Sequence, residues 1–325
     1  MKLIIQIPCY NEADTLPQTV AELPKQIPGV SCIETLVIDD GSTDNTAEVA
    51  RQLGIDHIIR HRQNMGLART FQTGLDTCLK LGADIIVNTD ADNQYPGRYI
   101  PDLVAPIIRQ EADIVIGDRQ VAQIPHFSPI KKLLQWLGSW MVRTVSGTNV
   151  PDAPSGFRAY SQEAALRLNI LTRYSYTLET IIQAGKLGLR LVSIPVKTNA
   201  PTRPSRLQRN MWHFIKAQTG TIMRLYAFYE PLRTFSYIAL PFLLAGIGLL
   251  GRFGYFYLIG IRGIGRFAQS VTIGTGLVLV GLIILLFGIQ ADIASKHRQL
   301  TQETLYRLKK MELQQHQTAN KQTQR

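Results

Sequence analysis

The chain has 325 residues, enough for one large or two ordinary domains, and the 45% of apolar residues support a substantial core. Its three cysteines are too few and too scattered for a disulfide framework, and no signal peptide precedes the first expected strand, so we expect the soluble part in the reducing cytoplasm. The net charge is +11, but residues 1–120 hold 10 Lys/Arg and 17 Asp/Glu whereas residues 121–325 hold 25 and 7. Because the basic half flanks apolar stretches, this distribution favours an anionic membrane surface over nucleic acid as the partner.

The first 200 residues alternate between short apolar runs and helical patterns. In chain order, the expected strands cover residues 3–8, 36–38, 85–87, 113–116 and 189–196, and the expected helices cover residues 13–25, 43–53, 66–81, 97–110, 129–146, 161–168 and 176–187. This alternation is typical of βαβ units. We therefore predict an α/β domain over residues 1–200 with a mainly parallel sheet.

Polar residues follow the ends of the first three strands. Cys9-Tyr10-Asn11-Glu12 follows the first strand, Asp39-Asp40-Gly41-Ser42 the second, and Asp90-Ala91-Asp92-Asn93-Gln94 the third. Asn64 precedes the helix over residues 66–81 and is expected to cap it. Because open α/β sheets bind ligands outside the carboxyl ends of their strands, we expect the acids at positions 39, 40, 90 and 92 to share one crevice.

Asp90 and Asp92 are the most informative pair. Two carboxylates one residue apart at a strand end can face one hard cation, and Mg²⁺ or Mn²⁺ usually takes one or two carboxylates together with phosphate oxygens. A pair of this kind standing alone is more often two solvated loop acids, but the neighbouring acidic strand ends favour a metal that neutralises a diphosphate leaving group. The sequence has no G-x-x-x-x-G-K-[ST] loop and no G-x-G-x-x-G after a strand, which disfavours P-loop and dinucleotide-binding enzymes.

The last third of the chain changes character. Residues 201–233 combine basic residues with aromatic and aliphatic residues at spacings of three or four, which predicts a basic amphipathic helix in the membrane interface or, alternatively, a surface helix packed on the α/β domain. Residues 234–290 hold two apolar stretches, each long enough to cross a hydrocarbon core, although a buried soluble hairpin is an alternative. Both outer flanks are basic, so we expect both ends in the cytoplasm, with residues 291–325 as a polar tail.

The order and spacing of these motifs resemble the family 2 glycosyltransferases. The resemblance rests on Pro8-Cys9-Tyr10-Asn11-Glu12, Val37-Ile38-Asp39-Asp40-Gly41-Ser42-Thr43-Asp44, Asn64-Met65-Gly66, Asp90-Ala91-Asp92-Asn93-Gln94 and Ser155-Gly156-Phe157-Arg158. It covers about residues 3–210 and implies the GT-A fold. The apolar pair that follows resembles the spans of polyprenyl-phosphate sugar transferases, of the dolichyl-phosphate mannose synthase and bactoprenol glucosyltransferase type. The resemblance thus implies inverting, metal-dependent transfer of a hexose from a UDP- or GDP-hexose to a polyprenyl phosphate, at the cytoplasmic face of a bacterial inner membrane.

The resemblance also implies roles for single residues on the donor side. The nucleotide pocket would be lined by Pro8, Tyr10, Glu12, Asp39 and Asn64, with Asp40 in support. The metal and diphosphate site would be formed by Asp90, Ala91, Asp92 and Gln94, with Mg²⁺ or Mn²⁺. A basic loop that closes over the diphosphate would contain Arg203 and Arg206.

Four further residues are expected near the reacting centre. Arg119 and Arg158 would bind phosphate, Asp152 would orient the acceptor, and Glu179 stands where related enzymes carry an acidic base. The alternatives are that Arg119 only pairs with Asp118 or a strand-end acid, that Asp152 caps the turn after Pro151, and that Glu179 is a helix-surface acid.

Two departures from the family pattern affect the acceptor side. Asp118 replaces the Ser of a Gly-Ser-Arg motif and no Gly-Gly follows, and Arg203-Pro204-Ser205-Arg206 stands in place of an Arg-x-x-Gly-x-Ser-Lys loop.

Two rival functions fit the same residues. One is a glycosyltransferase that extends a lipid-linked saccharide at a hydroxyl, which needs Asp152 or Glu179 as a base. The other is a membrane-tethered protein that binds a nucleotide sugar without catalysis, and the intact acids argue against it. The sugar, the base of the nucleotide and the oligomeric state, including a possible homo-oligomer, are left open by the sequence.

Overall fold

The computed structural model describes residues 1–120, 129–170, 176–199, 227, 229–259 and 264–323. The chain forms two compact units, one made of Met1–Ile222 with Gln302–Arg325 and the other of Met223–Thr301. The expected interfacial helix falls almost wholly on residues 200–226, outside the described residues.

A seven-stranded sheet forms the centre of the first unit. Its strands are β1 Lys2–Cys9, β2 Cys32–Asp39, β3 His57–Arg60, β4 Ile85–Asn88, β5 Ile114–Asp118, β6 Arg158–Ser161 and β7 Leu191–Pro195, in the order β3-β2-β1-β4-β6-β5-β7. Only β6 runs antiparallel to its neighbours β4 and β5, and the other pairs are parallel. The prediction of a mainly parallel sheet is therefore confirmed. The sequence missed β3 and β6, which are four residues long and too short to show a period.

The helices of this unit follow the expected alternation. They are α1 Leu16–Ala21, α2 Thr46–Gln52, α3 Leu67–Lys80, a 3-10 turn Gly97–Tyr99, α4 Ile100–Ile108, α5 Pro129–Ser146, α6 Gln162–Arg167 and α7 Tyr176–Lys186. The residue that caps α3 is Gly66, whose φ of 89° lies in a region that a side chain disfavours, so the prediction of Asn64 as the cap is wrong.

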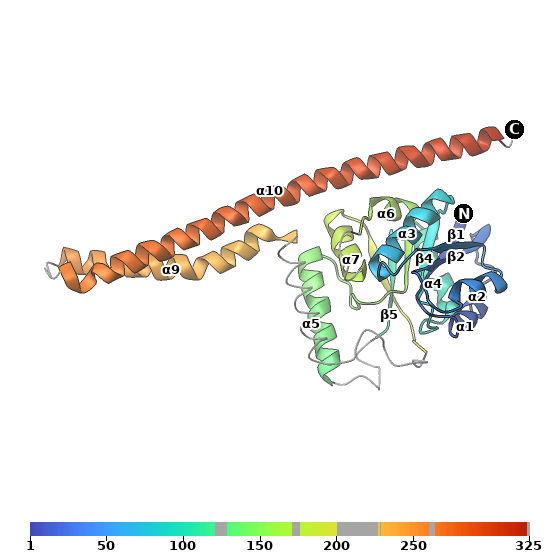
Figure 1. Ribbon diagram of the computed structural model, residues 1–325, viewed down its shortest axis with the longest axis horizontal. Helices are drawn as coiled ribbons and strands as arrows, with labels where there is room; N and C mark the ends of the chain where they lie inside the picture. Colours follow the sequence, from blue (N-terminus) through green and yellow to red (C-terminus); the bar gives the residue numbers. More distant parts are fainter. Residues whose placement is uncertain (121–128, 171–175, 200–226, 228, 260–263, 324–325) are drawn as a thin grey trace. The chain divides into compact units, whose positions relative to one another are not determined.

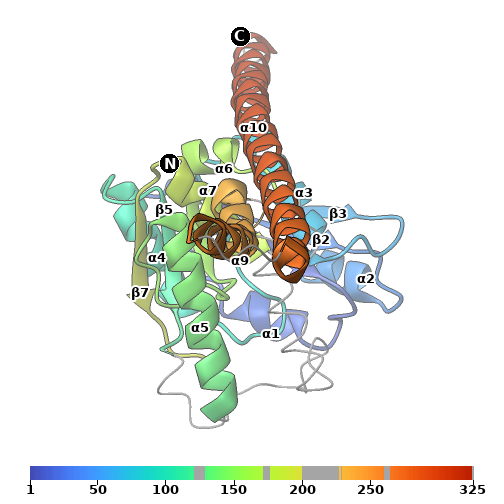
Figure 2. The same cartoon turned by 90° about the vertical axis from the view of Figure 1, so that its left-hand side faces the viewer.

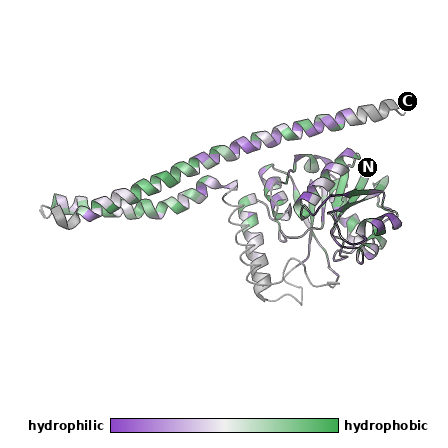
Figure 3. Ribbon diagram, viewed as in Figure 1, coloured by the Kyte–Doolittle hydropathy of each residue, from purple (hydrophilic) through white to green (hydrophobic). Residues whose placement is uncertain are grey.

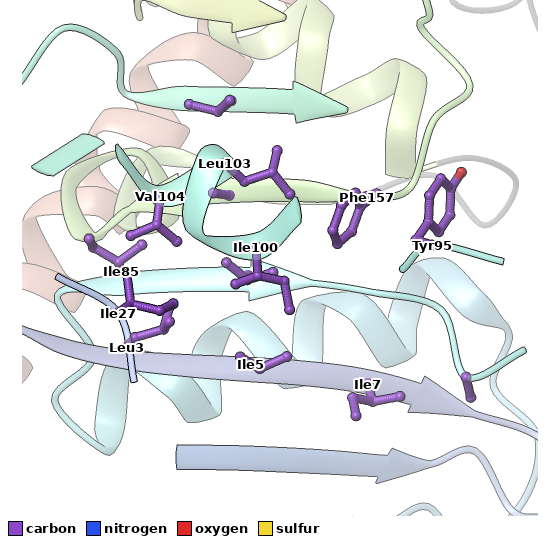
Figure 4. Close-up of a cluster of buried hydrophobic side chains, with 14 of the residues drawn as sticks. Leu3, Ile5, Ile7, Ile27, Ile85, Tyr95, Ile100, Leu103, Val104 and Phe157 are labelled. Atoms are coloured by element: carbon purple, nitrogen blue, oxygen red, sulfur yellow. The ribbon is translucent and has the colours of Figure 1, made fainter. Parts of the chain in front are cut away.

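Both faces of the sheet are covered by helices (Figure 1 and Figure 2). On one face, Leu3, Ile5 and Ile7 of β1 pack in one buried cluster with residues of α4 such as Ile100 and Leu103 (Figure 4). On the other face α3 comes so close that a Cβ on Gly74 would stand 2.3 Å from Gln6 Oε1. Strands buried on both faces read as continuous apolar runs, so the polar residues that this sheet can offer a ligand lie beyond the strand ends.

The second unit holds α9 Pro231–Leu258 and most of α10, a helix that runs from Ile264 to Thr323 and whose residues from Gln302 onward belong to the first unit. The helix α9 and the part of α10 that packs on it are rich in apolar residues (Figure 3). Both are long and apolar enough to cross a membrane. They pack together through small residues: a Cβ on Gly246 would lie 2.8 Å from the carbonyl oxygen of Gly274. Their length, composition and pairing indicate membrane anchoring.

Candidate active site

The carboxyl ends of β1, β2 and β4 lie side by side at one edge of the sheet. The main-chain N–H of Asp40 donates to Cys9 O at 2.8 Å, and that of Thr89 donates to Gln6 O at 3.2 Å. Burial raises the pKa of the Cys9 thiol well above its usual value, and the negative charges of Glu12, Asp39, Asp44 and Asp90 raise it further. Acids from three separate loops, including Asp39 and Asp90 of the predicted set, therefore lie near the buried Cys9.

The loops after β1 and β2 are joined into one unit. Asn11 has a φ of 54°, which its short polar side chain tolerates, and its Oδ1 accepts the N–H of Thr43 at 2.8 Å. Its own N–H donates to Ser42 Oγ at 2.9 Å, and the N–H of Glu12 donates to Thr46 Oγ1 at 2.9 Å. Pro8 lies in β1 just before this loop, and Tyr10 is exposed at the rim. The geometry fixes both loops before any ligand binds.

Asp39 is fully buried at the end of β2. Its Oδ1 accepts the N–H of Ser42 at 2.8 Å. Its Oδ2 lies 3.1 Å from Arg60 Nε but without the alignment of a hydrogen bond. A buried carboxylate oxygen without an aligned donor can accept a hydrogen bond from a hydroxyl or N–H of a ligand, if the Arg60 side chain moves away.

Asp40 supports the loop that follows β3. It accepts the N–H groups of Met65 and Gly66, both at 2.9 Å, and its Oδ1 lies at hydrogen-bond distance, 2.7 Å, from His61 Nδ1. Gly41 allows this loop to approach, since a Cβ there would stand 2.6 Å from the carbonyl carbon of Gln63. Asn64 is exposed on the same loop. The supporting role that the resemblance implied for Asp40 agrees with these contacts.

Asp90 and Asp92 follow β4 and are only partly exposed. Burial and the charge of Asp92 raise the pKa of Asp90 to about 7; nearby Arg119 opposes this rise and Glu12 adds to it. Such a pair is stabilised by a cation, so the residues present fit Mg²⁺ or Mn²⁺. Among the described residues no cluster of three or more acidic, His or Cys side chains is placed to hold a metal. The protein would thus supply two carboxylates and leave the other positions to water and phosphate oxygens.

The loop that carries these acids is held from two sides. Thr19 Oγ1 of α1 donates to the carbonyl oxygen of the buried Ala91 at 3.0 Å, and Asn93 Nδ2 donates to Glu22 Oε1 at 2.9 Å. From the other side, the main-chain N–H of Asn199 donates to Gln94 O at 2.9 Å. Gln94 contacts one of the two acids through its main chain, because its N–H donates to Asp92 Oδ1 at 3.1 Å.

Arg119 and Asp152 form a two-point ion pair. Arg119 Nε lies 2.7 Å from Asp152 Oδ2 and Nη2 lies 2.8 Å from Oδ1, while the main-chain N–H of Arg119 also donates to Oδ2. Both side chains are largely buried. The structure therefore brings Arg119, Asp152 and Asp90 into one electrostatic neighbourhood.

Arg158 has a different place from the one expected. It is fully buried, and its guanidinium donates to the carbonyl oxygens of Ala153, Ser155 and Thr177 and to Thr180 Oγ1. These bonds tie the loop before β6 to α7, a placement that does not suit the phosphate-binding role implied by the resemblance.

Glu179 and the two loop arginines complete the predicted set. Glu179 is fully buried in α7 and accepts from Gln183 Nε2 at 3.2 Å, so the interpretation as a helix-surface acid is wrong. Arg203 and Arg206 lie outside the described residues.

A family model described as Glycosyl transferase family 2 matches residues 4–168, just over half of the chain. The chain belongs to glycosyl transferase family 2. It is 29% identical over 206 residues to an undecaprenyl-phosphate mannosyltransferase of Micrococcus luteus, a match that spans 60% of this chain and 83% of that protein. It is 31% identical over 217 residues to a UDP-N-acetylglucosamine–dolichyl-phosphate N-acetylglucosaminyltransferase of Methanococcus voltae, spanning 59% and 83%.

A solved structure establishes the fold. Glucosyl-3-phosphoglycerate synthase from Mycobacterium tuberculosis, in complex with Mn²⁺, UDP and glucosyl-3-phosphoglycerate, superimposes with a TM-score of 0.53 and 19% identity, covering 70% of this chain and 79% of that one. This family 2 glycosyltransferase therefore has a GT-A-like fold, and the predictions of family, fold class and enzyme class are confirmed.

Several residues around the candidate site were not predicted from the sequence. His61 and Arg60 were missed because β3 was missed. Behind Asp90, a buried polar chain runs from Gln6 through Asn88, whose Nδ2 donates to Gly156 O at 2.9 Å and to Tyr176 Oη at 3.1 Å. A polar residue inside an apolar strand, such as Gln6 in β1, is the signal that could have pointed to this network.

Proposed function

We propose that this glycosyltransferase transfers a hexosyl group from a nucleoside-diphosphate sugar to a polyprenyl phosphate, with inversion at the anomeric carbon and with Mg²⁺ or Mn²⁺. The observation that carries the proposal is the paired carboxylates Asp90 and Asp92, at the sheet edge where the nucleotide loops meet, in a chain with two long apolar helices. The two relatives described above are named for transfer to undecaprenyl or dolichyl phosphate.

On the donor side, the nucleotide would lie against the joined loops of β1 and β2. Tyr10 would offer its ring, Glu12 and Asp39 their carboxylates, and Asn64 its amide from the loop that Asp40 holds. Asp90 and Asp92, with Gln94 as a candidate third ligand, would hold the metal, which supplies positive charge to the leaving diphosphate. Arg203 and Arg206 are proposed to close over the diphosphate.

On the acceptor side, Arg119 is the proposed phosphate contact. Both oxygens of Asp152 already accept hydrogen bonds from Arg119, so taking up a proton there would break a two-point ion pair. A phosphate acceptor needs little help from a base, because its second pKa near 6 leaves it largely anionic at pH 7. The pair thus favours a phosphate over a sugar hydroxyl as the acceptor.

The membrane arrangement is part of the same proposal. The two apolar helices would span the bilayer as a hairpin with both ends in the cytoplasm, as the basic flanks indicate. A polyprenyl phosphate presents its head at the membrane surface, so an anchored catalytic domain meets it there without releasing it into water.

The deciding experiment is product analysis with purified protein in detergent. Radiolabelled UDP- and GDP-hexoses are offered with either undecaprenyl phosphate or an undecaprenyl-linked monosaccharide, with Mn²⁺ or with EDTA, and Asp92→Ala is compared with Asp102→Ala, an exposed acid of α4. We expect a lipid product from the phosphate acceptor only, lost in EDTA and in Asp92→Ala but not in Asp102→Ala. A product formed only from the saccharide acceptor refutes the acceptor, and undiminished transfer in EDTA refutes the metal.

A further inference from the structure

The C-terminal part of α10 is docked on the catalytic domain. Residues Gln302–Arg325 belong to the same compact unit as the sheet. Within this part Tyr306 is buried to 9% exposure, whereas Leu308 and Met311 remain more than half exposed. Tyr306 is thus shielded from solvent while Leu308 and Met311 on the same helix are not, so the helix presents one face to the domain.

Tyr306 is held by α6. Its hydroxyl donates to Glu163 Oε1 at 2.8 Å, and the guanidinium of Arg167 lies 4.6 Å from the centre of its ring. Arg167 also pairs with Glu163 along α6 at 2.7 Å. Burial opposes the charge of Glu163, but the hydrogen bonds from Arg167 and Tyr306 outweigh it and lower the pKa of this carboxyl.

Two lysines extend the contact. Lys309 Nζ donates to Asp76 Oδ1 of α3 at 2.7 Å. Lys310 Nζ donates to the hydroxyl of Tyr306 at 3.0 Å and lies 3.9 Å from Glu163 Oε2 of α6. Asp76 is itself anchored, because it accepts from Gln72 Nε2 at 3.0 Å. Residues 306, 309 and 310 are separated by three and four positions and therefore share one helix face.

The chemistry of the two sides is complementary. The helix face carries a phenol and two ammonium groups, and the domain offers two carboxylates and a guanidinium over the ring. Exposed ion pairs by themselves contribute little to stability, so the buried Tyr306 distinguishes this contact from chance pairing of surface charges.

We propose that Tyr306, Lys309 and Lys310 form a docking face by which α10 positions the catalytic domain for transfer to a membrane-embedded acceptor. The same helix contains the second apolar span and continues unbroken from Ile264 to Thr323. The docking face therefore gives the catalytic domain a helical connection to the anchor, in addition to the chain that leaves β7. The role in transfer rests on the proposed function, whereas the docking does not.

The docking is tested by exchanging the charges of one pair. Lys309→Asp and Asp76→Lys are made singly and together in the full chain, and Tyr306→Ala is made separately. Hydrogen exchange of the α6 amides is then measured in detergent for each variant and for the wild type. We expect faster exchange in α6 for Tyr306→Ala and for each single charge variant, and recovery in the double charge variant. Arg307→Ala, which removes an exposed arginine paired within its own helix, is the matched control and should leave exchange unchanged. Unchanged exchange in Tyr306→Ala overturns the docking.

Cross-linking tests whether the contact lies within one chain. Lys309→Cys and Asp76→Cys are combined with Cys32→Ser, which removes the exposed native thiol. An oxidised product of monomer size supports the proposal, whereas a covalent dimer shows that the helix docks on a second copy and overturns it.

The positioning role is tested by two measurements on Tyr306→Ala, lipid transfer and nucleotide binding. In vesicles containing undecaprenyl phosphate, Tyr306→Ala should lower lipid transfer severalfold while Mn²⁺-dependent binding of the nucleotide, measured by calorimetry, stays unchanged. Equal transfer by Tyr306→Ala and wild type overturns the positioning role. Absence of lipid transfer in the wild type is a failure of the proposed function instead, and the exchange result then still decides the docking.

Discussion

Asp90 and Gly156 lie opposite each other just beyond the paired ends of β4 and β6. A Cβ on Gly156 would stand 3.3 Å from Asp90 Oδ2 and 2.7 Å from the hydroxyl of Tyr176. The missing side chain at position 156 thus leaves room for the Asp90 carboxylate, a proposed metal ligand, beside the buried Tyr176. This gives a physical reason for a glycine within the Ser155-Gly156-Phe157-Arg158 motif.

Gly156→Ala should therefore weaken Mn²⁺ binding and lower the thermal midpoint. Overpacking a filled site costs roughly 1–3 kcal/mol, because neighbouring groups must move. The Tyr176→Phe change removes the closest of the clashing atoms, so the double variant should recover part of the loss in stability. Calorimetric titration with Mn²⁺ and thermal unfolding measure the two effects. Tyr160→Phe, at a second buried tyrosine that also contacts Phe71, is the control and should not rescue Gly156→Ala.

The pKa of Asp90 makes the metal-free protein sensitive to pH. In the folded state this pKa is raised from 3.8 to about 7, first by burial and then by Asp92, so the folded state binds the proton more tightly than the unfolded chain. The stability contributed by that proton is present below pH 4 and is lost as the pH rises through 7. In EDTA, Asp90→Asn should therefore raise the thermal midpoint more at pH 8 than at pH 5. Asp102→Asn should show no such pH dependence. An equal effect of Asp90→Asn at both pH values contradicts the assignment.

Arg158 should prove essential for folding rather than for phosphate binding. Its guanidinium serves three carbonyl oxygens and one hydroxyl in the core, and hydrogen bonds to a charged group contribute about 1.5–3 kcal/mol each. Arg158→Lys cannot reach all of them and should lower the thermal midpoint strongly. Arg109→Lys, at an exposed arginine, should not. If folded Arg158→Lys protein keeps the wild-type midpoint but loses acceptor binding, the phosphate role is restored.

The sequence was sufficient where the chemistry is local. Acids directly after apolar strands can be placed at the sheet edge without knowing the packing, because parallel strands end together; hence Asp39 and Asp90 were predicted at one edge. The same reasoning could not decide which of the two adjacent acids, Asp39 or Asp40, supports the neighbouring loop. Adjacent residues at a strand end point to opposite sides, and the partner of Asp40, His61, follows a strand of only four residues.

The partners of the two arginines depend on tertiary packing, which the sequence alone does not reveal. Whether an arginine meets phosphate or backbone depends on which groups surround it, and the carbonyls that bind Arg158 come from a loop and from α7. The pairing of Arg119 with Asp152 joins residues 33 positions apart. For Arg119 the sequence offers pairing with Asp118 or with a strand-end acid as the alternative, and its partner in the structure, Asp152, is neither. Long-range contacts of this kind have no period in the sequence.

Asp152→Asn separates the two acceptor classes. If the acceptor is a phosphate, the nucleophile is already ionised, so the variant should retain measurable transfer and show mainly a raised KM, because Arg119 loses its charged partner. If Asp152 were the base for a sugar hydroxyl, kcat would fall by about 10²–10⁴. Asp118→Asn, one residue from Arg119 and outside the ion pair, controls for the loss of a nearby negative charge. The measurement is the initial rate of lipid-product formation at varied undecaprenyl phosphate and at pH 6 and 8. A fall in kcat of that size with an unchanged KM would assign proton abstraction to Asp152 and refute the phosphate acceptor.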